Sequence, residues 1–369
     1  MSDKKQWRFE PLDSWFFREA RAFGTSGNNE LSSLFPPSAR TVAGAVRTLI
    51  GETQGVDWQQ FAQDGEYADL KRWIGFGDDL GTLKITGPYP LWKGERLYPA
   101  PLHLLGKGEK YVFLKPGEPV ECDLGKVRLP QLAIVLPGAK PLESVWLDGA
   151  DLKRVLCSEN PKTVYRSSDL YDVEPRLGIA RNNAQRTAAD GLLYQTRHLR
   201  PRPELSIGVT VSSIPSELHP AHGITRFGGE GRASSVTIGE AALLPAASKQ
   251  QSQNLLLMLL THADFGDQRW LPAEFKSSEQ NGIRVWCGQL HGVDLILHSA
   301  VLGKAAREGG WDLLNQKPRP VKSQIPAGSV YFCTVTGDPK AAVDALHGQH
   351  IGNETALGRG QLAVGFWKF

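Results

Sequence analysis

The stretch Phe35-Pro-Pro-Ser-Ala-Arg-Thr-Val-Ala-Gly-Ala-Val-Arg-Thr48 predicts an amphipathic helix over residues 39–50. Two prolines end any earlier strand. Ser38 is a good N-cap, because its hydroxyl can accept a hydrogen bond from a free N–H of the first turn. Apolar residues then follow helical spacing and should face a core: Val42, Ala45, Val46, Leu49 and Ile50. Gly51 is the expected end of the helix.

The other face of this helix carries Arg40, Gly44 and Arg47. A glycine inside a helix costs about 1 kcal/mol relative to alanine. That cost is understandable if another molecule must approach the backbone at Gly44, and the two arginines then point to a phosphate backbone. The alternative is a solvated arginine face in which the glycine has no special role.

The composition is that of a globular protein with a local concentration of arginine. With 369 residues and 41% hydrophobic content, the chain should form two domains with real cores. The formal net charge of +3 is mild. Residues 176–202, however, hold six arginines and one acid, an excess of five positive charges. This distribution, rather than the net charge, favours a nucleic-acid partner.

The cysteines and the apolar runs indicate a cytoplasmic protein. The four cysteines are scattered, with no pair spaced for zinc and no short disulfide framework, so we expect reduced thiols. No signal peptide follows the polar start of the sequence. The longest apolar run, residues 255–260, is too short to cross a bilayer, so no membrane partner is expected.

Alternation, together with glycine and proline, predicts further elements. Strands are expected over residues 11–23, 83–88, 97–105, 131–136, 205–211, 328–336 and 361–369, with a second helix over 339–346. A polar seam over residues 245–253 is the best domain boundary. The strand–helix–strand content of both halves fits two ferredoxin-like βαββαβ units.

Several segments, taken in order, resemble one known family. After the segment over residues 11–23 and the helix quoted above, they are Glu174-Pro-Arg-Leu-Gly-Ile-Ala180, Thr225-Arg-Phe-Gly-Gly-Glu-Gly-Arg232, Ile325-Pro-Ala-Gly-Ser-Val-Tyr-Phe332 and Gly358-Arg-Gly-Gln-Leu-Ala-Val-Gly-Phe366. In this order they resemble the third subunit of the Cmr complexes, the type III-B CRISPR effectors. The resemblance covers nearly the whole chain and is weakest over residues 54–81.

The resemblance implies an α+β protein with two ferredoxin-like (RRM-like, RAMP) domains, which carry long inserted loops and β-hairpins. The first domain, residues 1–244, would contain an arginine-rich hairpin at about 176–200. The second domain, residues 245–369, would end in a glycine-rich loop and strand. The implied function is that of a non-catalytic RNA-binding subunit without metal or cofactor. It would hold the 5′ tag of the guide crRNA and join the large polymerase/cyclase-like subunit to the backbone subunit, with target RNA as an indirect partner.

The candidate RNA-binding residues follow from this resemblance and from the local charge. Residues 178–191 form a polar arm between two apolar ends, and such an arm is costly to order unless it meets a partner. The glycine-rich turns could bind phosphate or could be structural turns. The complete set is Arg18, Arg21, Arg40, Gly44, Arg47, Arg176, Gly178, Arg181, Asn182, Arg186, Arg197, His198, Arg226, Gly228, Gly229, Arg232, Gly358, Arg359 and Gly360.

Other functions remain open at this point. Gly75-Phe-Gly-Asp-Asp79 resembles the carboxylate turn of palm-type polymerases, but no other acid cluster accompanies it, which favours a plain acidic turn. His198, within the arginine-rich run, is the best candidate base for a metal-independent endoribonuclease that processes crRNA. A protein adaptor without RNA contact is a third possibility.

Overall fold

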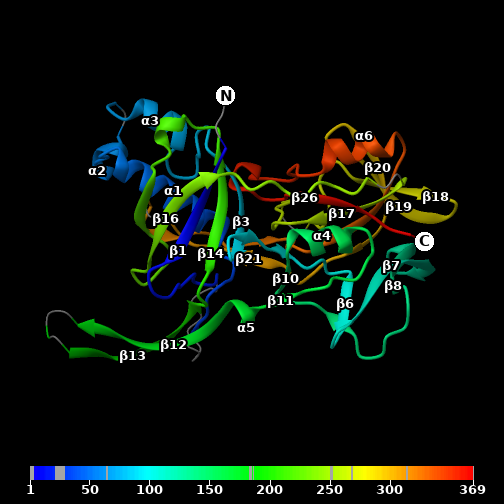
Figure 1. The fold of residues 1–369 in the computed structure, drawn as a ribbon, viewed down its shortest axis with the longest axis horizontal. Coiled ribbons are helices and arrows are strands. Elements are labelled where there is room, and N and C mark those ends of the chain that lie inside the picture. Colours follow the sequence, from blue (N-terminus) through cyan, green and yellow to red (C-terminus); the bar gives the residue numbers. More distant parts are fainter. Residues whose placement is uncertain are drawn as a thin grey trace. The chain divides into compact units, whose positions relative to one another are not determined.

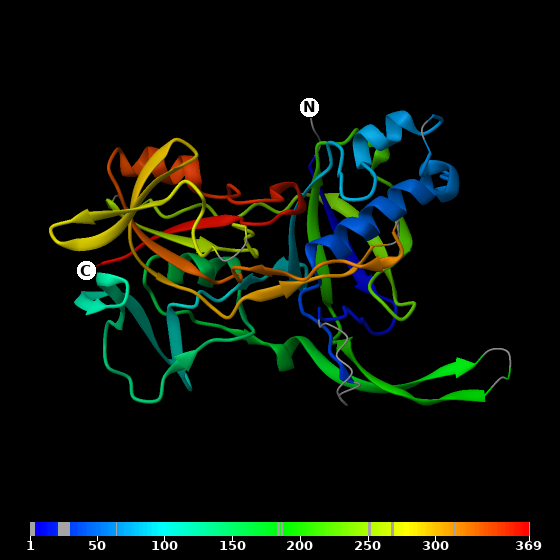
Figure 2. The ribbon, with the colours of Figure 1, turned by 180° about the vertical axis from the view of Figure 1, so that it is seen from behind.

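The computed structural model describes residues 4–20, 30–63, 65–182, 185, 187–249, 252–266, 269–312 and 315–368. The chain forms two compact units, each assembled from three separate segments. Unit 1 comprises Met1–Glu95, Ser167–Ala242 and Arg307–Lys322, and unit 2 comprises Arg96–Arg166, Leu243–Ala306 and Ser323–Phe369. Figures 1 and 2 show their elements from opposite sides. Both units combine helices with sheets whose pairings are mostly antiparallel, so the expected α+β class is confirmed.

Unit 1 is built on a six-stranded sheet with the strand order β15-β16-β1-β14-β3-β4. Its strands are β1 (Lys5–Pro11), β3 (Lys84–Trp92), β4 (Glu95–Arg96), β14 (Leu205–Ser212), β15 (His222–Arg226) and β16 (Ala233–Glu240). β14 pairs antiparallel with both β1 and β3, so β1 and β3 run parallel to each other. Trp7 and Phe9 of β1 and Ile207 and Val209 of β14 are fully buried, which places the core of unit 1 at these central strands.

The helix α1 (Ala39–Thr53) lies between β1 and β3 in the chain and packs on β3 and β15. The Ser38 hydroxyl accepts a hydrogen bond from the Thr41 N–H at 3.2 Å, which confirms the expected N-cap. The expected end at Gly51 is wrong, because the helix continues to Thr53. A Cβ at Gly51 would lie 2.4 Å from the Trp58 ring, so this glycine makes room for Trp58. Two short helices follow, α2 (Trp58–Phe61) and α3 (Ala68–Ile74).

The aromatic segment after β1 is not the strand expected over residues 11–23. β1 ends at Pro11, and Trp15, Phe16 and Phe17 are buried in consecutive positions along an irregular segment. Three consecutive buried side chains do not fit a strand with one solvated face, whose side chains alternate in direction. Trp15 and Leu199 exchange two backbone hydrogen bonds of 2.8 Å, which anchor this segment to the neighbouring hairpin.

That hairpin is the longest pairing of unit 1. It consists of β12 (Tyr171–Asn182) and β13 (Thr187–Pro201), and β13 also pairs parallel with β2 (Glu30–Leu31). The short helix α5 (Ser167–Leu170) precedes it. In Figure 1 the two green strands run from α5 out beyond the sheet of unit 1. The arginine-rich arm of the sequence is therefore a two-stranded ribbon.

Unit 2 is built on a second six-stranded sheet, with the order β18-β19-β20-β25-β17-β26. Its strands are β17 (Asn254–Leu259), β18 (Lys276–Gln280), β19 (Ile283–Leu290), β20 (Val293–Val301), β25 (Val330–Val335) and β26 (Leu362–Phe366). The helix α6 (Pro339–Leu346) lies between β25 and β26 in the chain and has the bounds expected from the sequence. The core of unit 2 includes Leu257, Leu295, Leu346 and Val364.

Smaller elements complete both units. In unit 2 they are β5 (Tyr98–Pro99), β6 (Leu104–Lys107), β7 (Lys110–Cys122), β8 (Gly125–Leu132), β9 (Lys140–Pro141), β10 (Val145–Leu147), α4 (Gly149–Leu156), β11 (Tyr165–Arg166) and η2 (Thr355–Leu357). In unit 1 they are η1 (Ser216–Leu218), β22 (Trp311–Asp312) and β23 (Lys317–Pro318). At the crossings between units lie β21 (Ala306–Glu308) and β24 (Lys322–Gln324).

The chain passes from one unit to the other several times. It crosses after residues 95, 166, 242, 306 and 322. One of these crossings lies two residues from the boundary expected after residue 244. Domains over 1–244 and 245–369 stay a prediction, since each compact unit also contains residues from the other side of that boundary.

Candidate nucleic-acid interface

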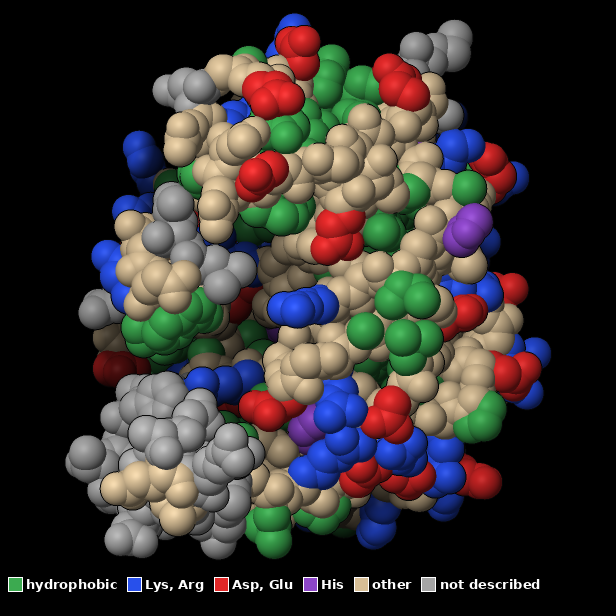
Figure 3. All heavy atoms as spheres, turned by 90° about the vertical axis from the view of Figure 1, so that its left-hand side faces the viewer, with side chains coloured by type: hydrophobic (Ala, Val, Ile, Leu, Met, Phe, Trp, Pro, Cys, Tyr) green, Lys and Arg blue, Asp and Glu red, His purple; other side chains and the backbone are tan. Residues whose placement is uncertain are grey.

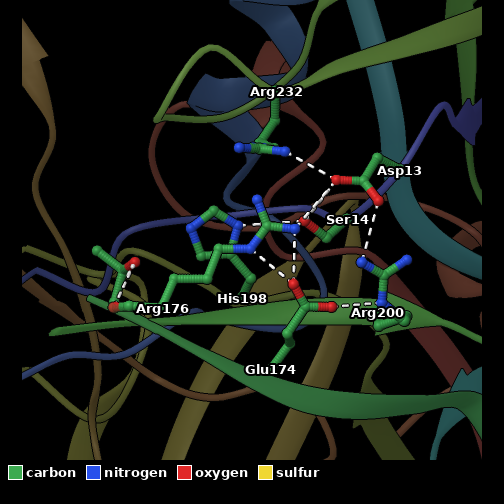
Figure 4. Close-up of polar contacts among 8 residues, drawn as sticks. Asp13, Ser14, Glu174, Arg176, His198, Arg200 and Arg232 are labelled. Atoms are coloured by element: carbon green, nitrogen blue, oxygen red, sulfur yellow. Dashed lines mark hydrogen bonds and ion pairs between the residues drawn. The ribbon is translucent and has the colours of Figure 1, made fainter. Parts of the chain in front are cut away.

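A cluster of ion pairs lies at the base of the hairpin, within unit 1 (Figure 4). The Asp13 carboxylate accepts hydrogen bonds from Arg176 at 3.0 Å and from Arg232 at 2.9 Å, and it forms an ion pair with Arg200 at 3.0 Å. The Glu174 carboxylate accepts from Nε of Arg176 at 2.7 Å and from Nε of Arg200. We call these five residues the Asp13 cluster. It joins four segments of the chain around two carboxylates.

The strand pairing explains why the hairpin residues of this cluster lie together. Glu174 and Arg176 are two residues apart on β12, and Arg200 lies two residues after His198 on β13. Glu174 is directly opposite His198 in the register. Residues two apart on a strand, and residues directly opposite each other, share a face of the ribbon. Asp13 comes from the segment after β1, and Arg232 comes from the turn before β16.

The cluster carries one net positive charge. The hydrogen bond from Arg176, with further contributions from Arg200, lowers the pKa of Asp13 to about 2. The hydrogen bond from Arg200, followed by that from Arg176, lowers the pKa of Glu174. Both carboxylates are therefore ionised at neutral pH, and they face three guanidinium groups. On the face shown in Figure 3, basic side chains lie intermixed with acidic ones in the lower part.

His198 lies beneath the cluster as a buried neutral ring. It is 1% exposed, stacks on Phe16 with 5.0 Å between ring centroids, and lies 3.2 Å from the Ser14 hydroxyl through Nδ1. Burial, followed by the charges of Arg176 and Arg232, lowers its pKa to about 4. A ring held in this way positions the hairpin against the aromatic segment.

The pKa of His198 predicts a pH dependence of stability. The folded-state pKa is depressed below the ordinary value of 6.5, so the unfolded chain binds more protons between these values. The stabilisation is present above about pH 6.5 and is lost progressively as the pH falls towards about 4. Urea unfolding at a series of pH values measures the number of protons taken up on unfolding. His198→Gln should lower this number by about one between about pH 4 and pH 6.5. Equal pH profiles for the parent protein and for His198→Gln would contradict this prediction.

The arginine face of α1 is covered by the acidic turn of unit 1. Asp78 pairs with Arg40 at 3.0 Å and with Arg319 at 2.5 Å, and Nη1 of Arg47 donates to the Gly77 carbonyl at 3.0 Å. Gly44 is exposed, and a Cβ there would meet nothing within 4 Å. The two arginines expected at a phosphate backbone therefore hold the turn over residues 75–79, whereas the glycine between them stays accessible.

The glycine candidates have packing contacts within their own unit. A Cβ at Gly178 would lie 2.4 Å from the ring of Tyr194, the residue opposite it in the hairpin. A Cβ at Gly228 would lie 2.5 Å from the Phe16 carbonyl, and the Gly229 N–H donates to that same carbonyl at 2.8 Å. These contacts account for the three glycines without a ligand.

The turn before the last strand is also fixed internally. Arg359 is 3% exposed and donates from Nε to Glu354 at 2.9 Å. The Gly358 carbonyl accepts from the Thr261 hydroxyl at 2.7 Å, and a Cβ at Gly360 would lie 1.9 Å from the Ile351 carbonyl. Of the two interpretations that the sequence left open, the contacts favour the structural turn.

The remaining candidates are spread over unit 1. Arg197 pairs with Glu30 at 3.2 Å, Arg226 is exposed on β15, and Arg18 forms an isolated bridge with Ser33. Arg181 and Asn182 belong to β12, and nothing is described of their side chains. Arg21 and Arg186 lie outside the described residues.

The structure thus brings together three of the predicted residues, Arg176, His198 and Arg232. The sequence did not indicate three of their partners, Asp13, Glu174 and Arg200, as site residues. Arg200 belongs to the arginine-rich run and could have been included on that signal. Asp13 carries no local signal, because the residues that it binds are remote in the sequence.

The described residues contain neither a cluster of metal ligands nor a helix that could span a membrane. In that part of the chain, no three or more His, Cys, Asp or Glu side chains lie where they could hold a metal ion. No helix among the described residues is long and apolar enough to span a membrane.

Comparison with known families gives a match over most of the sequence. The sequence model of the family described as CRISPR-associated protein (Cas_Cmr3) matches residues 7–367. The chain belongs to this family. The resemblance to the third Cmr subunit is thereby confirmed. No curated protein sequence matches this Cas_Cmr3 family member significantly.

Solved structures resemble this Cas_Cmr3 family member at low identity. A chain in a cryo-EM structure of the Type III-B Cmr-beta bound to cognate target RNA has a TM-score of 0.49 and 16% identity, over 97% of this chain and 96% of that one. With AMPPnP also bound, the values are 0.48 and 15%, over 97% and 98%. A chain in a crystal structure of a Csm1-Csm4 cassette with AMPPNP has a TM-score of 0.34 and 12% identity, over 92% and 97%.

Proposed function

We propose that this chain is the non-catalytic RNA-binding subunit of a type III-B CRISPR effector in the cytoplasm, and that it holds the 5′ tag of the guide crRNA. The observation that carries the proposal is the Asp13 cluster at the base of the long hairpin. Guanidinium groups bind phosphate well. A two-stranded ribbon with arginines at its base also offers an extended surface to single-stranded RNA. Membership of the Cas_Cmr3 family supplies the CRISPR context.

The strand orders support a ferredoxin-like assignment for both units. In each sheet, four strands lie in the order fourth, first, third, second when numbered along the chain: β16-β1-β14-β3 in unit 1 and β26-β17-β25-β20 in unit 2. α1 lies between the first two strands of unit 1, and α6 lies between the last two strands of unit 2. Each unit thus keeps one of the two helices of a βαββαβ motif.

We further propose that the chain joins the large polymerase/cyclase-like subunit to the backbone subunit and meets target RNA only indirectly. This role is the one implied by the resemblance to the third Cmr subunit, and membership of the Cas_Cmr3 family supports that resemblance. The runner-up is a crRNA-processing endoribonuclease, with His198 as the base. Against it stands the environment of His198, because its ring is buried, stacked on Phe16 and in contact with a single hydroxyl through Nδ1.

Ultraviolet crosslinking of the assembled complex, followed by mapping of the crosslinked peptides, tests the proposal. We expect the guide RNA to crosslink through nucleotides of its 5′ tag to peptides from β12 and β13. The purified chain should leave repeat RNA intact with or without magnesium. Cleavage that His198→Ala abolishes would replace this proposal by the nuclease. Normal assembly without any crosslink would replace it by the protein adaptor.

A further inference from the structure

The guanidinium groups of the Asp13 cluster use only part of their donor capacity on protein atoms. An arginine side chain has five N–H donors. Arg176 and Arg200 each bind the carboxylates through Nε and Nη2, and Arg232 binds Asp13 through Nη1. Among the described residues, Nη1 of Arg176, Nη1 of Arg200 and Nη2 of Arg232 bind no acceptor. The Arg232 Nε is buried and also lacks one.

The three arginines are also reachable from solvent. The exposed fractions of their side chains are 29% for Arg176, 47% for Arg200 and 23% for Arg232. A partly exposed arginine with open N–H groups binds a phosphate oxygen well, often through two parallel hydrogen bonds. The cluster therefore has the chemistry of a phosphate site.

The carboxylate of Asp13 contacts all three arginines. They come from β12, from β13 and from the turn before β16. A long arginine side chain loses rotamer entropy when it is fixed in one conformation. Because Asp13 binds each guanidinium through contacts within the chain itself, these contacts fix the arginine side chains without help from a ligand. Its negative charge, however, opposes an incoming phosphate.

We propose that Asp13 is a positioning residue for a phosphate site formed by Arg176, Arg200 and Arg232. Asp13 holds the three guanidinium groups so that their open N–H donors bind one phosphate of the guide RNA backbone. The inference rests on the proposed RNA-binding function and names the place where the RNA backbone is held.

Charge and positioning predict opposite effects of removing the carboxylate. If Asp13 were only a counter-charge, Asp13→Asn would raise the positive charge of the site and tighten RNA binding. If Asp13 orients the arginines, the same change releases them and weakens binding. Loss of one charge-assisted hydrogen bond corresponds to about a tenfold weaker affinity.

The test is the dissociation constant for native guide RNA of the complex assembled with full-length variant chains, measured over a series of salt concentrations. Asp13→Asn should bind about tenfold more weakly. Asp13→Glu, which keeps a carboxylate, should recover most of the affinity. The matched control is Asp172→Asn: Asp172 lies opposite Arg200 in the hairpin, but its carboxylate pairs with Arg202 at 2.9 Å rather than with an arginine of the cluster. It should leave the affinity unchanged or slightly higher.

The following results would overturn the inference. Equal or tighter binding by Asp13→Asn makes Asp13 a simple counter-charge. Equal weakening by Asp13→Asn and Asp172→Asn indicates a general effect on the hairpin, and so does Asp13→Glu binding no better than Asp13→Asn. If Asp13→Asn does not fold, Glu174→Gln removes the other shared carboxylate and is judged by the same criteria. Failure of the unmodified complex to crosslink RNA through this chain overturns the inference together with the proposed function, whereas normal crosslinking with unchanged affinity in the variants overturns the inference alone.

Discussion

Gly228→Ala is expected to lower the free energy of unfolding by about 3 kcal/mol. Gly228 has a φ of 95°, a left-handed conformation that costs a residue with a Cβ about 1–2 kcal/mol. The new Cβ would also lie 2.5 Å from the Phe16 carbonyl, so the aromatic segment has to move, at a further cost of about 1–3 kcal/mol. Urea unfolding of the purified chain measures the change.

The matched control for this prediction is Gly231→Ala in the same turn. Gly231 has a φ of 67°, but a Cβ there meets nothing within 4 Å. Gly231→Ala therefore introduces backbone strain without a steric contact, and it should lower the free energy of unfolding by about 1 kcal/mol. If the two variants lose the same free energy of unfolding, the backbone at Phe16 moves away from the new Cβ at no cost in stability. Because Phe16 stacks on His198, Gly228→Ala should also disturb the base of the hairpin.

The double variant Arg176→Ala/Arg200→Ala is expected to weaken guide RNA binding about a hundredfold. Two charge-assisted contacts are lost, each of about 1.5 kcal/mol, and Asp13 and Glu174 are left without two of their cationic partners. Each phosphate contact on a single strand contributes about −0.7 to the slope of log K against log salt. The slope should therefore flatten by roughly 1.4. A salt titration of RNA binding by the assembled complex gives both quantities.

Arg202→Ala is the control for charge alone. Arg202 lies directly after β13 and pairs with Asp172 rather than with the Asp13 cluster. Its removal should change the affinity little, because its guanidinium forms an exposed ion pair with Asp172 instead of binding Asp13 or Glu174. If Arg202→Ala and the double variant weaken binding to the same extent per arginine, the hairpin attracts RNA by diffuse charge. The cluster would then have no special role.

The elements that could be predicted from the sequence are those with local signals. α1 has its cap at Ser38 and its apolar face within fifteen residues, and α6 begins after Asp338 with a proline at its first position. The strands expected over residues 83–88 and 205–211 exist as β3 and β14. In each case the deciding interactions lie within the element or on one alternating face.

Other elements were predicted wrongly, because an apolar run does not by itself determine whether its side chains are buried. A strand was expected over residues 131–136, but β8 ends at Leu132, and Ile134 and Val135 are 74% and 79% exposed. The expected strand over residues 97–105 is divided into the short β5 and β6. Prolines at positions 99 and 101 remove backbone donors that a continuous ladder would need.

The candidate site was predicted in part for a similar reason. Arg176 and Arg232 lie in segments that carry the resemblance to the family, and His198 lies within the arginine-rich run. Asp13 lies 163 residues from Arg176 and 219 residues from Arg232. No periodicity or spacing joins residues so far apart, and only the tertiary fold brings them into contact.

The division of unit 1 into three segments governs the order in which the protein can be completed during synthesis. Asp78 is made 241 residues before Arg319, the arginine that pairs with it. At about 5–20 residues per second, the ribosome needs roughly 10–50 s to supply that partner. Over this interval the acidic turn has Arg40 and lacks Arg319, so unit 1 is finished only after most of unit 2 has been translated. A fragment that stops at residue 244 would remain in this incomplete state permanently.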